Sequence, residues 1–550
     1  MKLFLTINSG TLAGQRYDLE AGFLTVGRGE MCSIRLDPIT ERIASKQHAF
    51  IEARFDGYYL TDNQSTNGTF LNGERVTSAK LRSGDVIQFG RNGVTATASI
   101  QDMVLPSVSK NEAPAKEAFR DLQIEQFNKL AESEPVDLQS SLSGIGLGRV
   151  DPRPQPKRTG LYIGIGLLVL TIPILITIVA LIMLQNVGLA PAILATVIAF
   201  TPAMLYLLPL IWLDRYDPEP LWLLALAFTW GALVAVIVSY IVNTVFGIVI
   251  YTGTGSAGAA NLASAILSAP IIEESSKGVG LLILLIFFRR YFDDIVDGIV
   301  FGGVIALGFA TVENVLYYGN GLNEAYYQYG FTSGALWSFL ILFAIRGMFS
   351  PFAHATFTSM TGIGCGIARE SHNGFVRFIM PIVGYILAVV LHMIWNAMTL
   401  VSLTILDSYE LLGNCELIGL GGENVGACGF FVAYIILQVP FFLIFTGFII
   451  YIMRRQRRIL NEMLALDVAR GLIPEEHLKI ATSLTRAQLW RWSGIFGGKY
   501  LNRSRYIRAI GKLGLSYWHI QRATAAQGQT ASFQQNPILR DEVLKWRDKV

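Results

Sequence analysis

Three ionisable residues lie in an apolar part of the chain where a membrane-spanning helix is expected. Glu273, Glu274 and Lys277 are flanked by apolar runs at residues 259–270 and 281–288. A charge at bilayer depth costs at least ~2.5–3.5 kcal/mol, so such residues usually face a bundle interior or a wet cavity. On a helix Lys277 shares a face with both carboxylates. It can hold one of them ionised while desolvation and repulsion favour the neutral acid at the other, as general acid/base chemistry requires. A salt bridge that only fixes helix packing is the alternative.

Four more polar residues lie within later apolar runs: Glu313, His354, His392 and Asn396. His392 and Asn396 are four residues apart and therefore share one helix face. A lone histidine in a membrane span is often a hydrogen-bonded packing residue. Glutamates in two spans and histidines in two others are harder to explain in this way, because each needs a polar partner or water. We therefore expect all these side chains to converge on one polar cavity.

The composition is that of a membrane protein with soluble ends. Of 550 residues, 52% are hydrophobic and only 15% are charged. The net charge of +3 is too small to indicate a nucleic-acid partner. None of the four cysteines forms a CxxC pair, which argues against a cysteine zinc site. The first residues lack a basic segment followed by an apolar one, so we expect no cleavable signal peptide.

Apolar runs long enough to cross a bilayer occur at eight places. They are residues 160–184, 189–213, 221–251, 259–288, 295–318, 331–368, 378–403 and 429–453. The sixth run is too long for one span, and we expect one crossing preceded by a re-entrant or surface helix. The positive-inside rule places the basic clusters between and beside these runs in the cytoplasm. The sequence thus predicts an integral protein of the plasma (inner) membrane with about eight spans and both termini cytoplasmic. Cys415 and Cys428 would then lie outside, where they could pair.

The first hundred residues predict an antiparallel β-sandwich, because short alternating runs are separated by turns rich in Gly and Asn. The expected strands are residues 2–7, 23–26, 33–36, 49–53, 58–61, 69–71, 85–89 and 94–99. Arg28, Ser45, Lys46 and Asn67 fall in three loops between these strands. On neighbouring loops they would make a small anion cradle with charge-assisted bonds to a phosphate.

In order and type, these loop motifs resemble those of the forkhead-associated (FHA) domain, over residues 1–100. The resemblance implies a β-sandwich whose loops bind phosphothreonine peptides. It assigns the phosphopeptide site to Arg28, Ser45, Lys46, Thr66 and Asn67, and it makes His48 a residue that braces the loops. Lys46 stands where the family usually has arginine, and residues 37–44 are long, which leaves the peptide preference open. A domain that binds protein without phosphate is the alternative.

Two further segments flank the apolar region. Residues 101–159 have the composition of a flexible linker, with a helix expected at 112–133. Residues 454–550 are basic, with amphipathic pieces and several aromatic residues, and predict a small helical cytoplasmic tail. This tail could lie on the anionic membrane surface or be an ordinary solvated extension.

Residues 160–453 resemble the PrsW family of intramembrane proteases, a branch of the CAAX-processing protease superfamily. Five motifs carry the resemblance: DRYDPEP at 214–220, EESSK at 273–277, FATVEN at 309–314, His354 with small residues after it, and HMIWN at 392–396. The resemblance implies peptide-bond hydrolysis within or beside the bilayer. By motif it assigns the catalytic centre to Glu273, Glu274, Glu313, His354 and His392, oriented or stabilised by Lys277 and Asn396. For residues 214–220 a structural role is favoured, since their prolines end one helix and begin the next.

Two mechanisms fit these residues. In one, Glu274, His354 and His392 hold a zinc ion, and the second glutamate of the pair is the general base. In the other there is no metal: a glutamate activates water, and His and Asn side chains stabilise the oxyanion. The chain has no HExxH motif, so the sequence leaves both open, with a metallopeptidase favoured.

The resulting hypothesis is a multidomain protein consisting of an FHA-like β-sandwich, an all-α transmembrane protease domain and a helical tail. It would cleave membrane-associated protein substrates and be regulated or targeted by a phosphothreonine-containing protein. The alternative is a non-enzymatic membrane scaffold or signalling receptor that recruits phosphorylated partners. A transporter is less favoured, because no inverted repeat with paired broken helices is visible.

Overall fold

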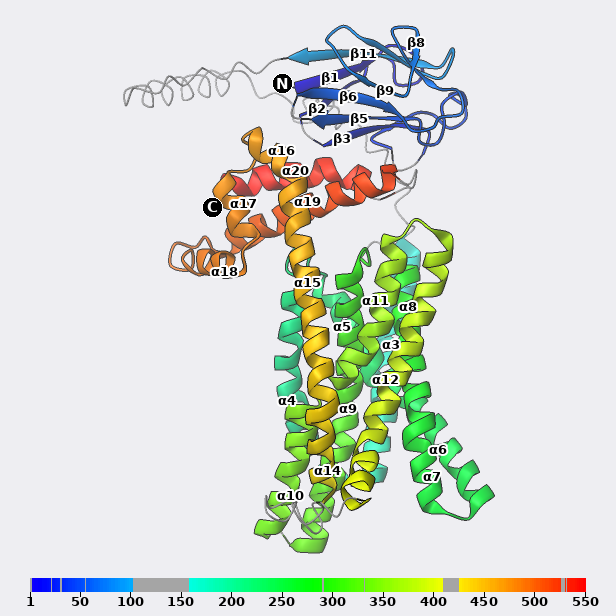
Figure 1. Ribbon diagram of the computed structural model, residues 1–550, viewed down its shortest axis with the longest axis vertical. Helices are drawn as coiled ribbons and strands as arrows, with labels where there is room; N and C mark the ends of the chain where they lie inside the picture. Colours follow the sequence, from blue (N-terminus) through cyan, green and yellow to red (C-terminus); the bar gives the residue numbers. More distant parts are fainter. Residues whose placement is uncertain are drawn as a thin grey trace. The chain divides into compact units, whose positions relative to one another are not determined.

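The computed structural model describes residues 2–101, 158–288, 291–408, 425–525 and 530–550, except positions 21, 30, 31, 55, 331 and 531. The chain folds into two compact units (Figure 1). One unit contains residues 1–161 together with residues 459–550, and the other contains residues 162–458. The expected helix at 112–133 lies outside the described residues. So does the pair Arg289-Arg290, one of the basic clusters expected in the cytoplasm.

The N-terminal part of the first unit is a sandwich of two β-sheets. Its strands are β1 (Lys2–Ile7), β2 (Arg16–Leu19), β3 (Phe23–Gly27), β4 (Ile34–Arg35), β5 (Ala49–Arg54), β6 (Gly57–Asp62), β7 (Thr69–Leu71), β8 (Glu74–Val76), β9 (Ser78–Lys80), β10 (Val86–Phe89) and β11 (Val94–Gln101). One sheet has the order β2-β1-β11-β10-β7-β8 and the other β4-β3-β5-β6-β9. Alternating side chains of β1 and β5 enter the core between the sheets, as period-2 patterning requires. The predicted β-sandwich is therefore confirmed, but the short strands β2, β8 and β9 were not foreseen.

The C-terminal part of the first unit is a cluster of helices with its own apolar core. After the end of α15 (Val439–Met463) come α16 (Ala465–Ala469), α17 (Glu475–Ala481), α18 (Leu484–Trp492), α19 (Tyr500–Ala525) and α20 (Ser532–Arg547). The core is centred on α19, whose buried side chains include Tyr506, Ile510 and Leu513. The tail is thus helical, as expected, although α15 continues beyond the predicted end of the last span at residue 453.

These C-terminal helices pack against the β-sandwich, which the sequence did not indicate. Arg540 of α20 bonds Glu20 at 2.9 Å. Arg470 donates to the Tyr58 hydroxyl at 3.1 Å and to the Arg54 carbonyl at 3.3 Å. The two ends of the chain therefore form a single folded unit.

The contact lies at one end of the sandwich. Gly22 directly precedes β3, and a Cβ placed on it would come within 2.4 Å of the Tyr517 ring, so glycine permits the close approach. Arg54 and Gly57 face each other at the β5–β6 turn, whereas Val26 pairs with Ala49 at the other end of these strands. The loops expected to bind a phosphopeptide follow Val26 and precede Ala49, so they lie at this second end of the strands. The contacts with the C-terminal helices are at the first end and leave these loops uncovered.

The second unit is a helical bundle. Its helices are α3 (Arg158–Val187), α4 (Leu189–Leu213), α5 (Leu221–Thr229), α6 (Val236–Thr254), α7 (Ala257–Ala263), α8 (Ala269–Phe287), α9 (Ile295–Tyr329), α10 (Ser333–Phe343), α11 (Ala353–Glu370), α12 (Gly374–Ser408), α14 (Val425–Ala433) and most of α15. In the described part of the bundle, π-helical turns interrupt the helices at η1 (Trp230–Ala235), η2 (Ser264–Ser268), η3 (Ala344–Phe349) and η5 (Tyr434–Gln438). Such turns are rare in proteins, and many of those that do occur lie at functional sites.

Six helical segments among the described residues are long and apolar enough to cross a membrane. They are Leu189–Leu213, Leu221–Thr254, Ile295–Ala325, Ser333–Glu370, Gly374–Ser408 and Val425–Met463. The chain is therefore an integral membrane protein, while the larger number of about eight crossings stays a prediction. Cys428 forms a disulfide, and its expected partner Cys415 lies outside the described residues.

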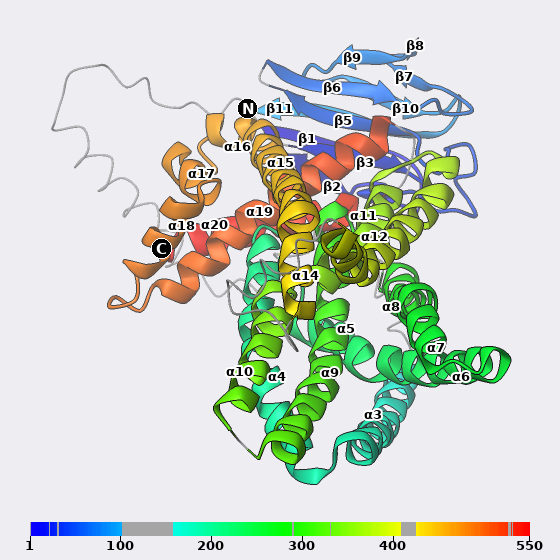
Figure 2. The ribbon, with the colours of Figure 1, turned by 60° about the horizontal axis from the view of Figure 1, so that its bottom comes forward.

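Helix α9 is the central helix of the bundle. Its apolar window is 94% buried, against 11–28% for the other five segments, and it packs against α4, α5, α10 and α11 (Figure 2). Gly298 of α9 and Gly362 of α11 face each other so closely that a Cβ on either would lie 1.9–2.0 Å from the opposite carbonyl oxygen. Glycines at this crossing thus let α11 approach α9, which brings polar side chains of the two helices together.

Candidate active site

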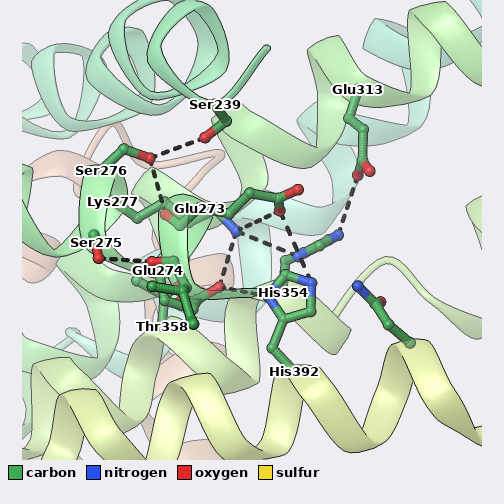
Figure 3. A network of polar contacts seen from close by, with 12 residues as sticks. Ser239, Glu273, Glu274, Ser275, Ser276, Lys277, Glu313, His354, Thr358 and His392 are labelled. Atoms are coloured by element: carbon green, nitrogen blue, oxygen red, sulfur yellow. Dashed lines mark hydrogen bonds and ion pairs between the residues drawn. The ribbon is translucent and has the colours of Figure 1, made fainter. Parts of the chain in front are cut away.

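Four helices of the bundle contribute to one buried polar cluster (Figure 3). Helix α8 carries Glu273, Glu274 and Lys277, α9 carries Glu313, α11 carries His354 and α12 carries His392. Five of these side chains are at most 9% exposed, and that of Glu313 is 19% exposed. The structure therefore brings together six of the seven residues that the sequence assigned to the catalytic centre.

Lys277 lies at the middle of this cluster. Its ammonium group is 2.9 Å from Glu274 Oε1 and 3.4 Å from Glu273 Oε2. It also lies 3.4 Å from His354 Nδ1 and over the Phe309 ring at 4.1 Å. One cation thus compensates two adjacent carboxylates, as the spacing on the helix predicted.

Glu274 is held on both carboxylate oxygens. Its Oε1 accepts from Lys277 and lies 3.1 Å from His392 Nδ1, and its Oε2 accepts from the Thr358 hydroxyl at 2.7 Å. A carboxylate beside an imidazole nitrogen favours the tautomer that donates to it. This contact therefore leaves the lone pair of His392 on Nε2, which lies 3.9 Å from Glu273 Oε2.

Glu313 orients the other histidine in the same way. Its Oε2 lies 3.1 Å from His354 Nε2, so the lone pair of His354 is on Nδ1. The same oxygen accepts from Arg346 at 2.6 Å. Arg346 also donates to Asn314 at 2.9 Å and stacks over the Tyr317 ring at 3.9 Å.

Arg346 was not among the residues chosen from the sequence. It interrupts the apolar run at 331–368, for which the sequence predicted one crossing preceded by a re-entrant or surface helix. The signal that could have identified it is the rule that a charge at bilayer depth needs a partner. Its position in η3, directly before the break at Ser350–Phe352, places the guanidinium toward Glu313 on α9.

Glu273 has the loosest contacts of the three carboxylates. Its Oε2 lies 3.4 Å from the Lys277 ammonium group and 3.9 Å from His392 Nε2. Glu273, His354 and His392 each offer one ligand atom, and these atoms lie within 4.8 Å of one another. Two histidines and a glutamate are a donor set that catalytic zinc sites use. These residues therefore fit a metal ion, with Glu273 rather than the expected Glu274 as the carboxylate ligand.

Three other polar residues brace the helices around the cluster. The Asn396 side chain donates to the carbonyl of Ala265 at 2.8 Å and so connects α12 to η2. The hydroxyl of Ser275 bonds that of Tyr385 at 2.7 Å, which connects α8 to α12. Asn396 therefore differs from the other six predicted catalytic residues: its side chain bonds a backbone carbonyl and not a side chain of the cluster.

The acidic segment at 214–220 has local structural contacts. Asp214 is buried, and its Oδ2 accepts from the backbone N–H of Glu219 at 2.6 Å. Pro220 immediately precedes α5, which begins at Leu221. This arrangement agrees with a segment that ends one helix and begins the next.

A second set of predicted residues meets at one end of the β-sandwich. Arg28, Ser45, Lys46, Thr66 and Asn67 lie on three loops that bond one another. The Ser45 hydroxyl accepts from the Thr66 backbone N–H at 3.0 Å, and Asn67 donates to the Ile43 carbonyl at 2.7 Å. Arg28 donates to the Ala44 carbonyl, and Lys46 is exposed. The loops thus form a connected, partly exposed surface with two cations.

His48 braces these loops from below, as expected. Its ring is buried; Nδ1 accepts from the Ser45 N–H at 2.9 Å, and Nε2 contacts the Gly68 carbonyl at 3.0 Å. Burial lowers the pKa of the His48 imidazole, so the ring stays neutral near pH 7. The residue ties the loop before β5 to the loop before β7.

Known proteins resemble this chain in its β-sandwich and in its helical bundle. Residues 219–444 match the PrsW family intramembrane metalloprotease model, and residues 24–90 match the FHA domain. Protease PrsW of Bacillus subtilis (strain 168) is 31% identical over 20% of this chain and 49% of its own length. Glycogen accumulation regulator GarA of Mycobacterium tuberculosis (strain ATCC 25618 / H37Rv) is 34% identical over 16% of this chain and 52% of its own.

The chain therefore spans about half the length of these curated relatives. A solved structure from a study of phosphothreonine-dependent FHA domain interactions is 29% identical, with a TM-score of 0.17. The match covers 19% of this chain and 100% of the chain in that structure. This chain thus combines a domain of the PrsW family of intramembrane metalloproteases with an N-terminal FHA domain.

Proposed function

We propose that this protein cleaves membrane-associated protein substrates at the cluster around Glu273, and that its FHA domain directs or regulates this activity by binding a phosphothreonine-containing protein. The observation that supports the proposal best is the meeting of Glu273, His354 and His392 in a buried position, with one ligand atom from each within 4.8 Å. A scaffold would have no need to bury two imidazoles and a carboxylate within ligand distance of one another.

Each residue of the cluster has a distinct task in this proposal. Glu273, His354 and His392 hold the metal, which when bound would polarise a peptide carbonyl and lower the pKa of a water molecule. Glu274 and Glu313 accept from the histidines and fix their tautomers. Lys277 balances the carboxylates, and Thr358 holds the second oxygen of Glu274.

Substrate trapping tests the proposed activity. Glu273→Gln keeps the size of the side chain but removes its charge, so substrates should remain uncleaved and accumulate in the membranes of cells that express it. Glu475→Gln is the matched control, since Glu475 is exposed and paired only with Lys479 on the surface of α17. If the two variants and the wild type leave the same membrane proteins intact, the non-enzymatic scaffold replaces the protease.

We further propose that both termini are cytoplasmic and that the FHA loops recognise phosphothreonine. The basic stretches at 369–377 and 454–458 support the orientation, because the positive-inside rule places them in the cytoplasm. The exposed end of the sandwich, where Arg28 and Lys46 meet hydroxyl and amide side chains, supports the recognition. A cytoplasmic FHA domain would have access to phosphorylated proteins.

The full-length protein in detergent should bind phosphothreonine peptides and neither their phosphoserine nor their unphosphorylated forms. Arg28→Ala should weaken this binding by ~1.5–3 kcal/mol, because a charge-assisted phosphate contact is lost. Arg82→Ala removes the same charge from an exposed position in the turn before β10, at the end of the sheet away from Arg28, and should leave affinity unchanged. Fluorescence anisotropy with labelled peptides measures both. Equal binding of plain and phosphorylated peptides would make this a general protein-binding module.

A further inference from the structure

An apolar surface on the C-terminal helices remains uncovered. It consists of Leu489 and Trp492 on α18, Ile495 and Phe496 in the turn after it, and Leu501 at the start of α19. These side chains are between 52% and 102% exposed, and Phe496 is the most exposed of them. Single apolar residues on a surface are ordinary, but five within thirteen positions form a patch of the kind that marks an interaction site.

Helix α18 has one face toward the folded core and the opposite face in the patch. Ala487 is buried in the apolar core of the C-terminal helices, and Trp490 packs against that core. Arg486, Leu489 and Trp492 recur every third residue, so they follow one another along the opposite, exposed face. The turn after α18 lies on the side of the C-terminal helices away from the β-sandwich (Figures 1 and 2). The FHA domain therefore does not cover the patch.

The segment that carries the patch is basic. Between Glu476 and Asp541 the sequence contains ten Lys and Arg residues and no Asp or Glu. Arg486, Lys499 and Arg508 are exposed on α18, the turn and α19. A surface with protruding aromatic and aliphatic side chains among cations is complementary to the headgroup region of an anionic bilayer.

We propose that the α18–α19 turn inserts Phe496 and its apolar neighbours into the interfacial region of a membrane that contains anionic lipid. The side chains would enter the boundary between headgroups and acyl chains while the cations remain among the phosphates. A bilayer is always near, because the described part of the same chain includes helices that are long and apolar enough to cross one. Of the possible partners, an anionic lipid surface is the one that both the charge and the protruding side chains fit.

Depth measurement in nanodiscs tests this proposal. The full-length Phe496→Cys protein is spin-labelled and placed in discs of phosphatidylcholine alone, or of phosphatidylcholine with phosphatidylglycerol. With the anionic lipid, oxygen accessibility should rise and accessibility to an aqueous nickel chelate should fall. A label at Ile39→Cys, an equally apolar and 71% exposed position in the FHA domain, should stay aqueous in both. The protein without an added cysteine gives the labelling background.

Charge reversal separates lipid attraction from other causes. Adding Arg486→Glu and Lys499→Glu to the Phe496→Cys protein should return the label to its aqueous values in the anionic discs. Arg35→Glu with Arg82→Glu changes the net charge equally, at exposed positions of the β-sandwich, and should not. An aqueous label in both lipid compositions would overturn the proposal. So would a label that is shielded equally in both, since that result would indicate contact with protein or a second copy.

Discussion

Glu273→Gln should abolish both metal binding and cleavage by the purified protein while leaving it folded. Glu273 is the carboxylate whose oxygen lies with one nitrogen each of His354 and His392. Glutamine is neutral and keeps the volume, so the pair of Lys277 and Glu274 at 2.9 Å remains as a buried ion pair. Metal content by mass spectrometry, together with cleavage of a substrate identified by trapping, measures the effect. Size-exclusion chromatography checks the fold.

Glu274→Gln is the informative comparison. Glu274 contacts His392, but it is not part of the group of Glu273, His354 and His392 whose ligand atoms lie within 4.8 Å of one another. Loss of a carboxylate that orients a ligating histidine typically costs 10–100-fold in metal affinity. Glu274→Gln should therefore weaken metal binding by about that factor, and Glu273→Gln should weaken it more. The reverse order would return the ligand set to Glu274, His354 and His392. Metal-free activity of the wild type would instead support water activation by a carboxylate alone.

Arg346→Met should destabilise the protein by ~3–5 kcal/mol, the cost of leaving one partner of a buried ion pair alone. Glu313 loses its 2.6 Å contact, and methionine fills part of the vacated volume. The double variant Arg346→Met with Glu313→Gln should regain much of the stability, because no buried charge remains. It should not regain cleavage, since His354 has lost the carboxylate that holds Nε2.

Thermal unfolding in detergent measures both variants. Arg369→Met is the control: Arg369 pairs with Asp293 at 3.2 Å, but the two side chains are 24% and 43% exposed. Water and salt screen such a pair, so its loss should cost about 0–1 kcal/mol in charge interaction. If Arg346→Met is no more harmful than Arg369→Met, the Arg346–Glu313 contact does not stabilise the bundle.

The sequence alone determined the local structure and the kinds of residue at each site. Alternation of apolar side chains identified most strands of the sandwich, because period 2 is a local property. Six of the eight apolar runs coincide with helical segments long and apolar enough to cross a membrane among the described residues, since a bilayer requires about twenty apolar residues for each helix. The strands β2 (Arg16–Leu19), β8 (Glu74–Val76) and β9 (Ser78–Lys80) escaped this reasoning because they are short and mostly exposed or half-buried, so their sequences show no apolar alternation.

The requirement that buried charges find partners was also visible in the sequence. It led to the expectation that Glu273, Glu274, Glu313, His354 and His392 meet, and the contacts on α8, α9, α11 and α12 bring them together. Asn396 was placed in the same group because it shares a helix face with His392. Its contact with Ala265 shows that a shared face restricts direction but does not choose between neighbouring partners.

Only the tertiary structure decided which partners meet. Glu273 and Glu274 are adjacent in sequence, but successive helical residues point about 100° apart. Glu273 therefore lies within ligand distance of both histidines, whereas Glu274 bonds Thr358 and His392 Nδ1. Arg346 acquired its role from a π-helical turn and from the close packing of α9. Arg540 and Glu20 lie at opposite ends of the chain and meet because the C-terminal helices and the β-sandwich fold as one unit. Such contacts depend on how whole elements pack, which no local pattern of residues encodes.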